Sequence, residues 1–262
     1  MSEEANPSVR KVKPPPEYPP EEGHYLRGND FSPAAVVILL HTFYDKIPDH
    51  LQRLASVAVE AGAALAGMLQ TENVGIEKII CNVVANPNIR YMIVCGVESA
   101  GHQPGQALSS LVRNGVDDRR VIVGAEGPTP YLYNIPLVSI ERFRKQVTLI
   151  DLIAENKTNI ATDLEQVRQA VWSCYQERPV KFMSFELYDV GAYAEPAICS
   201  RLTWRIEKPW TAVTDEEARV LKSIQDSARK RREMSDEELL RLLKPGKYQR
   251  EATKKEEENT RA

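Results

Sequence analysis

The chain has 262 residues, of which 42% are hydrophobic and 27% charged, and its formal net charge at pH 7 is −3. This is the composition of an ordinary globular protein, and the charge gives no indication of nucleic acid or an anionic membrane as a partner. We see neither an apolar run near the roughly 18 residues of a membrane span nor a signal peptide, and the four widely spaced cysteines favour reduced thiols in a cytoplasmic protein.

The first part of the chain is predicted to be a flexible, proline-rich arm over residues 1–24. An alternation of strands and helices follows it. The continuous apolar run at 34–40 is typical of a strand that is covered on both faces. A helical stripe at 51–61, with Pro48 in its first turn, precedes a second predicted strand at 63–69.

The alternation continues through the middle of the chain. A helix is predicted from the stripe at 76–84, with Asn73 as its N-cap, and a buried strand from the apolar run at 90–96. The next helix is expected near 106–113 and ends at Asn114-Gly115. Strands that alternate with helices predict right-handed βαβ units, and hence an α/β fold with a three-layer parallel sheet.

The later elements are predicted from shorter signals. Val121–Val123 indicates a further short strand, and apolar spacing indicates a helix over roughly 137–153. A capping box at Thr162–Glu165 opens another helix, which would close a main domain at 25–178.

The remainder is predicted to be an extension and a tail. Residues 179–246 are expected to be irregular and helical, with capping boxes that open helices at 214–233 and 236–243. The charged residues 247–262 are expected to be disordered.

A ligand site is predicted where the carboxyl ends of the parallel strands meet, because open α/β sheets bind ligands at that edge. The loops at 70–73, 96–104 and 125–136 are expected there and are rich in glycine, proline and polar groups. Their candidate residues are Thr71, Glu72 and Asn73; Gly96, Glu98, Ser99, Gly101, His102, Gly105 and Gln106; and Gly124, Gly127, Pro128, Pro130 and Tyr131.

His102 is the central candidate, because an imidazole at this edge can ligate a metal, move a proton or form a hydrogen bond. From the residues alone, a hydrogen-bonded loop histidine is the simpler interpretation. Thr71 and Asn73 could have no role beyond starting a helix. The glycines and prolines could have no role beyond shaping turns. The three remaining histidines, His24, His41 and His50, are expected to be solvated.

Several strings of residues carry a resemblance to a known family: 62–67, 70–78, 85–91, 101–106, 114–116 and 127–131. In order and spacing they resemble the corrinoid-carrying A subunit of tetrahydromethanopterin S-methyltransferase. The resemblance covers about 17–155 and continues more weakly to about 197. The membrane-bound form of the family ends in an anchor, whereas this chain ends in charged segments, so it resembles a cytoplasmic homologue without the anchor.

The resemblance implies a Rossmann-like fold that binds cobalamin, with His102 as the lower axial ligand of cobalt. It implies a methyltransferase subunit that accepts a methyl group from a methylated pterin and passes it to an acceptor such as a thiol, which is coenzyme M in methanogens. The resemblance also implies partner subunits that bind donor and acceptor and catalyse both transfers. The residues themselves show no nucleophile–base pair that would work unaided. The other ring nitrogen of His102 needs a partner, for which Glu72 and Glu98 are candidates.

Two alternatives stay open at this point. One is a non-enzymatic protein that senses a corrinoid or pterin, or that delivers the cofactor. The other is a Rossmann-like nucleotide-binding domain, although the residues that follow the strand at 34–40 do not form the G-x-G-x-x-G motif of dinucleotide-binding proteins.

Overall fold

A computed structural model of the protein describes residues 10–42, 47–99, 101–153 and 162–202, together with Arg219 and Lys222. The chain divides into two compact units, Met1–Trp204 and Arg205–Ala262. Every element described below belongs to the first unit. Apart from Arg219 and Lys222, the helices predicted at 214–233 and 236–243 and the tail at 247–262 lie outside the described residues.

Within the described residues, a five-stranded sheet with the order β1-β3-β2-β4-β5 forms the centre of the first unit. Four strands are parallel: β2 (Ala34–Leu39), β3 (Leu65–Leu69), β4 (Tyr91–Gly96) and β5 (Thr148–Asp151). The edge strand β1 (Tyr25–Arg27), which the sequence did not predict, runs antiparallel to β3. Every residue of β2 and β4 is buried, as expected for strands that are covered on both faces.

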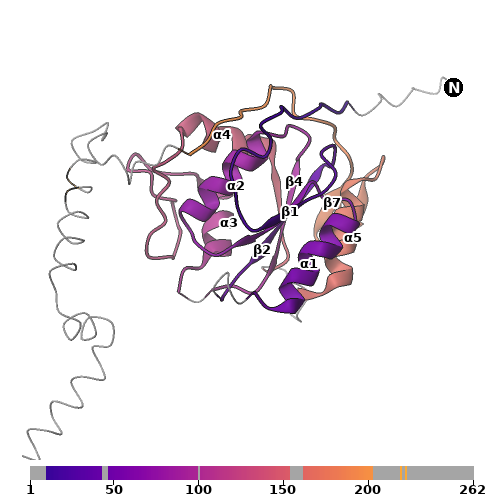
Figure 1. Ribbon diagram of the computed structural model, residues 1–262, viewed down its shortest axis with the longest axis horizontal. Coiled ribbons are helices and arrows are strands. Elements are labelled where there is room, and N and C mark those ends of the chain that lie inside the picture. The colour runs from indigo at the N-terminus through magenta and orange to yellow at the C-terminus, as the bar shows by residue number, and fades with distance from the viewer. Residues whose placement is uncertain are drawn as a thin grey trace, which may run out of the picture. The chain divides into compact units, whose positions relative to one another are not determined.

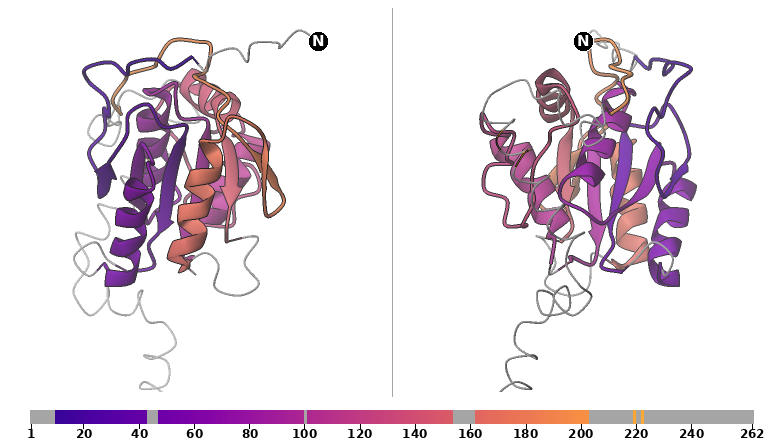
Figure 2. Two further views of the ribbon diagram at one scale, coloured as in Figure 1. Left: turned by 90° about the vertical axis from the view of Figure 1, so that its right-hand side faces the viewer. Right: turned by 60° about the vertical axis from the view of Figure 1, so that its left-hand side comes forward.

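Helices cover both faces of this sheet, as Figure 1 and Figure 2 show. On one face α1 (Asp49–Glu60) packs beside α5 (Leu164–Cys174). On the other face lie α2 (Val74–Val84), α3 (Pro104–Asn114) and α4 (Leu137–Gln146). The predicted α/β class with a mostly parallel sheet is therefore confirmed.

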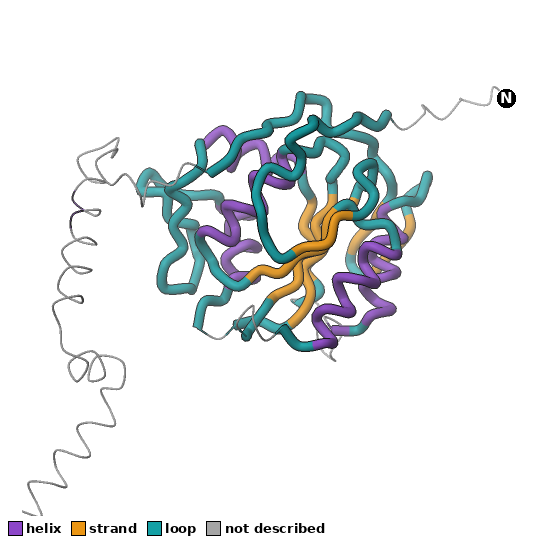
Figure 3. Tube along the Cα trace, in the orientation of Figure 1, coloured by secondary structure: helices purple, strands orange, loops and turns teal. Residues whose placement is uncertain are grey.

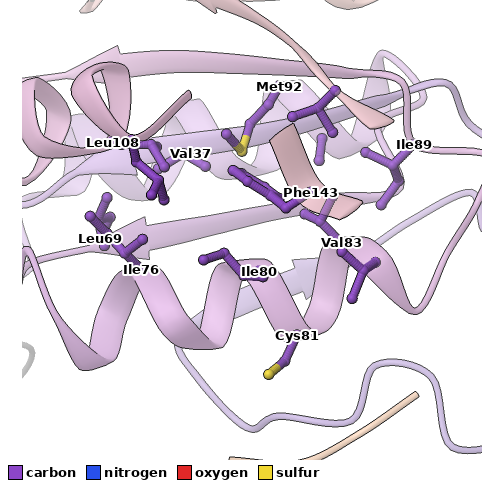
Figure 4. Close-up of a cluster of buried hydrophobic side chains, with 14 of the residues drawn as sticks. Val37, Leu69, Ile76, Ile80, Cys81, Val83, Ile89, Met92, Leu108 and Phe143 are labelled. Atoms are coloured by element: carbon purple, nitrogen blue, oxygen red, sulfur yellow. The ribbon is translucent and has the colours of Figure 1, made fainter. Parts of the chain in front are cut away.

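The side chains of β2 divide between two hydrophobic cores, because successive residues of a strand point to opposite faces. Val37 and Leu39 belong to the core beneath α2, α3 and α4, which also holds Met92 and Phe143 (Figure 4). Ile38 belongs to the core beneath α1 and α5. Each large side chain that is fully buried in this way contributes about 1.5–3 kcal/mol of transfer free energy.

The helix predicted over 137–153 is wrong in its second half. Helix α4 ends at Gln146, and β5 begins two residues later and pairs in parallel with β4. Val147 and Ile150 fit a helical stripe by their spacing. The run from Val147 to Ile150 is rich in β-branched residues, however, and these residues favour a strand once a pairing partner is available.

The strand predicted at Val121–Val123 is also wrong. Val121 and Ile122 form only isolated antiparallel bridges, with Tyr131 and Val116 respectively. These residues belong to a looped segment between α3 and α4. Ile122 is apolar because its side chain is buried in the core beneath the helices, and it adds no strand to the sheet.

The flexible arm predicted for residues 1–24 is packed, from Arg10 onward, against the rest of the first unit. The Asn88 side chain accepts a hydrogen bond from the N–H of Val12 at 2.9 Å and donates one to its carbonyl at 2.6 Å. The Asn82 side chain forms the same reciprocal pair with the backbone of Glu21. Proline prevents regular structure here, but it does not prevent an extended segment from packing.

The chain after α5 also stays within the first unit, past the boundary predicted at residue 178. A hairpin of β6 (Val180–Phe182) and β7 (Phe185–Leu187) packs beside α5. Residues 188–202, which we call the strap, then run along the amino-terminal edge of the sheet. The strap reaches the arm, where the N–H of Leu202 donates to the Glu21 carboxylate at 2.6 Å.

Candidate functional site

The strand order creates a crevice at the carboxyl edge of the sheet. The connection from β2 to β3 passes through α1 on one face, whereas the connection from β3 to β4 passes through α2 on the other. The carboxyl ends of β2 and β4 therefore lie at the switch point where open α/β sheets bind ligands. Gly96 ends β4 there with φ +95°, and a Cβ atom on it would lie 2.7 Å from the carbonyl oxygen of Leu39.

The loop after β4 brings His102 to a buried carboxylate. Nδ1 of His102 lies 2.8 Å from Oε2 of Glu72. The Glu72 side chain is fully buried, whereas 47% of the His102 side chain is exposed. Because an ionised carboxylate only accepts hydrogen bonds, the proton of the neutral imidazole lies on Nδ1. Nε2 then carries the lone pair, and it makes no hydrogen bond to any residue that the structure describes.

Thr129 holds the other oxygen of the same carboxylate. Its backbone N–H and its hydroxyl both donate to Oε1 of Glu72 at 2.9 Å. Burial alone raises the pKa of Glu72. Hydrogen bonds from its own backbone and from Thr129, together with the neighbouring His102, outweigh burial and lower this pKa below the ordinary value. Glu72 is therefore ionised at neutral pH, and it orients the imidazole through Nδ1.

Thr71 and Asn73, on either side of Glu72, begin helix α2. Asn73 Oδ1 accepts the N–H of Val74 at 2.7 Å, and Thr71 Oγ1 accepts the N–H of Gly75 at 3.1 Å. The helix-start interpretation of both residues is confirmed. Asn73 also donates from Nδ2 to Oγ1 of Thr129 at 3.0 Å. The start of α2 and the loop at 125–136, which we call the third loop, thus fix the position of Glu72 together.

Glu98 caps helix α3 and leaves Glu72 as the partner of His102. Its Oε1 accepts the N–H groups of Ser99 and Gly105, each at 3.2 Å, and its Oε2 accepts the N–H of Gln106 at 2.9 Å. A Cβ atom on Gly105 would lie 2.5 Å from Leu39 Cδ1 and 2.6 Å from Glu98 Oε2. Glycine at this position allows α3 to begin close against β2.

Gln106 joins the loop after β4 to the third loop. Its Nε2 donates to the carbonyl oxygen of Gly124 at 2.9 Å, and its Oε1 accepts the N–H of Glu126 at 3.0 Å. Gly124 has a φ of +82°, a backbone conformation that favours glycine. The third loop therefore reaches the site even though no sheet strand precedes it.

The two glycines nearest His102 have different surroundings. A Cβ atom on Gly127 would lie 2.4 Å from the carbonyl oxygen of His102 and 2.9 Å from Cγ of Glu72. Gly127 is therefore required by a close approach of the third loop to the other two. A Cβ atom on Gly101 would meet nothing within 4 Å.

The remaining predicted residues of the third loop surround Thr129. Pro128 and Pro130 flank it directly in the chain, and the carbonyl of Pro130 accepts the N–H of Ile122 at 2.9 Å. The ring of Tyr131 stacks on Tyr133 with centroids 5.2 Å apart. Sequence reasoning did not select Thr129 itself. Its hydroxyl between two prolines was the available signal, but only the folded loop shows that it contacts Glu72.

Residues 11–184 match the family model of the A subunit of tetrahydromethanopterin S-methyltransferase. The chain belongs to this family. One of the two A subunits of this enzyme from Methanothermobacter thermautotrophicus, the one numbered 1, is 41% identical over 175 residues, which are 66% of this chain and 66% of that protein. The one numbered 2 from the same organism is 42% identical over 160 residues, 60% of this chain and 81% of the relative.

A third relative, the A subunit of the enzyme from Methanosphaera stadtmanae, is 35% identical over 182 residues, 69% of this chain and 62% of the relative. The chain thus spans about two thirds of the length of the longer relatives. All residues of the site lie within the range that matches the family, whereas the strap lies beyond it. Within the described ranges, no helix combines the length and apolarity that a membrane crossing requires.

Proposed function

We propose that this chain is a methyl-carrier subunit of a methyltransferase system and that it binds cobalamin, with Nε2 of His102 as the lower axial ligand of cobalt. The contact between Nδ1 of His102 and the buried, ionised Glu72 supports this proposal most directly. Histidines that ligate metals usually donate their other ring N–H to a carboxylate or carbonyl, which fixes the tautomer.

The donor set of the site fits a metal that already carries its own chelating ring. Among the described residues there is no cluster of three or more histidine, cysteine or acidic side chains that could hold a bare ion. His102 offers a single nitrogen, and Glu72 is occupied by His102 and Thr129. A single imidazole would suffice to hold a corrinoid, because the corrin ring itself already chelates the cobalt.

The exposure of His102 fits a large planar ligand. Nearly half of its side chain is exposed, at an edge where the loops before α2, after β4 and after α3 meet. We assign the corrin contacts to the residues of these loops, with Gly101, Gln106 and Tyr131 among them. The bound corrinoid supplies the methyl-transfer chemistry, whereas the protein sets the ligand, its orientation and its access.

The residues of the chain control the proton on the axial ligand. Glu72 keeps the Nδ1 proton in place at 2.8 Å, so Nε2 is available for the metal. The single lone pair of Nε2 would serve either a metal or a proton, and not both at once.

The relatives are named for tetrahydromethanopterin and for S-methyl transfer. By analogy we propose a methylated pterin as donor and a thiol as acceptor for this chain, each bound by a partner methyltransferase subunit. The non-enzymatic alternative shares the cofactor site. A corrinoid-loaded protein that no methylated pterin can methylate, with a partner methyltransferase present, would favour a sensor or delivery role instead.

Electron paramagnetic resonance of the Co(II) form tests the axial ligand. The purified chain is reconstituted with hydroxocobalamin, freed of unbound cofactor and reduced. Nitrogen splitting of the cobalt lines is expected in a triplet pattern, which becomes a doublet when the histidines carry ¹⁵N. That change separates a protein imidazole from the benzimidazole of the cofactor.

Matched variants complete this experiment. His102→Ala should lose the protein-derived splitting, whereas His50→Ala, which changes an exposed histidine of α1, should keep it. Glu72→Gln should keep the cofactor but weaken the ligation. A folded wild-type chain that retains no corrinoid, or a splitting that survives His102→Ala, would overturn the proposal.

A further inference from the structure

A cavity of about 510 Å³ lies beside helix α2. None of the residues that line it belongs to the contact chain of His102, Glu72 and Thr129. Its volume falls within the range of about 300–1,000 Å³ that is typical of small-molecule sites. The proposed function does not use this space.

The cavity exists because no helix covers the β1 end of this sheet face within the described residues. Helix α2 packs on this face. Beside it, the chain that leads into β1 forms an arch that joins α2 to the sheet (Figure 3). Residues 22–24 of this arch and Tyr25 at the start of β1 line the cavity. The side chain of Lys78 donates to the carbonyl oxygen of Glu22 at 3.0 Å and ties the arch to α2.

The floor of the cavity is apolar. It consists of Ala35 and Val37 on β2 and of Leu65 and Gly67 on β3, with Ile79 on the wall formed by α2. Ala35 is a small side chain on this floor, whereas Tyr25 closes the space over Gly67, where a Cβ atom would lie 2.7 Å from Cβ of Tyr25. A pleated sheet with short apolar side chains favours a planar, mostly apolar ligand, because its ring can lie flat against the floor.

The rim carries the charged groups. Lys78 and the imidazole of His24 line it, as does Glu22. Asn82 also lines the cavity, but its amide is paired with the backbone of Glu21 through bonds of 2.8 and 3.1 Å. The ammonium group of Lys78, on α2 beside the apolar floor, is the group best placed to attract an anion.

We propose that this cavity is a second binding site, and that it takes a planar aromatic acid whose ring lies on the floor and whose anionic group meets Lys78. The site is separate from the corrinoid site and does not depend on the proposed function. Ring burial supplies most of the affinity, and the charge supplies the preference for an acid.

Two fluorescent probes that differ by one charge test the proposal. 8-Anilinonaphthalene-1-sulfonate carries a sulfonate, and N-phenyl-1-naphthylamine is the same aromatic framework without it. Each is titrated into the full chain, and amide chemical shifts locate the bound probe. Saturable binding is expected for both, with shifts concentrated at Gly67, Lys78 and Ile79.

Variants separate the ring from the charge. Lys78→Met should weaken sulfonate binding about fivefold, the upper range for a partly exposed charge pair, and leave the neutral probe within about twofold. Ala35→Leu should abolish binding of both probes. Ala66→Leu is the matched control, because Ala66 lies on the neighbouring strand and lines a hollow on the opposite face of the sheet. Thermal unfolding verifies that each variant folds.

The result must also be independent of His102. Binding of both probes should persist in His102→Ala and in the presence of hydroxocobalamin. Displacement by hydroxocobalamin would show that the cavity belongs to the corrinoid site and would overturn the proposal. Equal sulfonate affinity in the wild type and in Lys78→Met, or shifts located away from α2, would overturn it as well.

Discussion

At the scale of single residues, the site depends on a carboxylate that is both buried and ionised. Glu72 has no exposed surface, and both of its carboxylate oxygens accept hydrogen bonds, Oε2 from His102 and Oε1 from Thr129. A buried charge is tolerated only when it is paired and hydrogen-bonded. The same contacts that make this charge tolerable also aim the imidazole.

The lowered pKa of Glu72 predicts a pH-dependent contribution to stability. Its ordinary value is 4.5 and the folded value is lower. The carboxylate therefore stabilises the fold fully above pH 4.5, and this stabilisation is lost as the pH falls through the folded value. Urea unfolding at pH 7 should show Glu72→Gln to be less stable by about 1.5–3 kcal/mol. The difference should shrink in acid, and a difference that is constant with pH would contradict this assignment.

The glycine contacts predict a second effect at this scale. Gly127→Ala should cost about 1–3 kcal/mol in the free energy of unfolding, the usual range for overpacking, because the new methyl group would meet the carbonyl oxygen of His102 at 2.4 Å. Gly101→Ala is the control, and it should stay within about 0.5 kcal/mol. Chemical denaturation measures both. Equal costs for the two variants would show that the close approach of Gly127 is unimportant.

At the scale of elements, the first turns of α2 and α3 build the site. Both helices begin at the carboxyl edge of the sheet, and each start is fixed by a candidate residue, Asn73 in α2 and Glu98 in α3. Between Glu98 and the first turn of α3 the chain passes through Gln103, whose φ of +46° is in the left-handed region. The cap therefore also fixes the two ends of the loop that carries His102.

Glu98→Ala tests this role of the cap. The loss of a capping carboxylate costs about 1 kcal/mol in the free energy of unfolding. The amides of Gly105 and Gln106 should exchange with solvent faster, and the loop of His102 should bind a corrinoid less tightly. Asp163→Ala removes the N-cap of α5, whose carboxylate accepts the N–H of Glu165 at 2.8 Å. It should cost similar stability without a change in corrinoid binding, and a change in both variants would argue against a local effect of Glu98.

At the scale of the whole first unit, the arm and the strap close the edge of the sheet that lies opposite the site. The guanidinium of Arg142 on α4 holds the strap. It donates to the Glu195 carboxylate and to the carbonyl of Pro196, both at 3.1 Å, and its Cζ lies 4.2 Å from the ring centroid of Tyr193. Arg90 lies 5.3 Å from the same ring. Arg142 and Arg90 lie in the part of the chain that matches the family model. They contact the strap, which lies beyond that part.

Arg142→Leu should release the strap. The substitution would remove the charged hydrogen bonds that the buried Arg142 donates to Glu195 and Pro196, so we expect a loss of about 1.5–3 kcal/mol in the free energy of unfolding. Chymotrypsin should also cleave faster at Tyr193. Lys145→Ala, on the exposed side of the same helix, is the control and should change stability by less than about 0.5 kcal/mol. Unchanged proteolysis in Arg142→Leu would show that other contacts hold the strap.

The sequence by itself determined the elements whose signals are local. Continuous apolar runs predicted the buried strands β2 and β4, and Asn73 marked the start of α2, because burial on two faces and helix capping both leave a pattern in the neighbouring residues. The alternation of strands and helices predicted a mostly parallel sheet, and with it the edge of the sheet at which His102 lies.

Only the tertiary structure decided the features that depend on distant partners. Thr148–Asp151 form a strand because β4 offers a free edge beside them. Glu72 rather than Glu98 became the partner of His102 because Glu98 is used by the N–H groups of α3. Thr129 reaches Glu72 across 57 positions of the chain. Such choices are made by competition for hydrogen-bond partners in three dimensions, which leaves no periodic signal in the sequence.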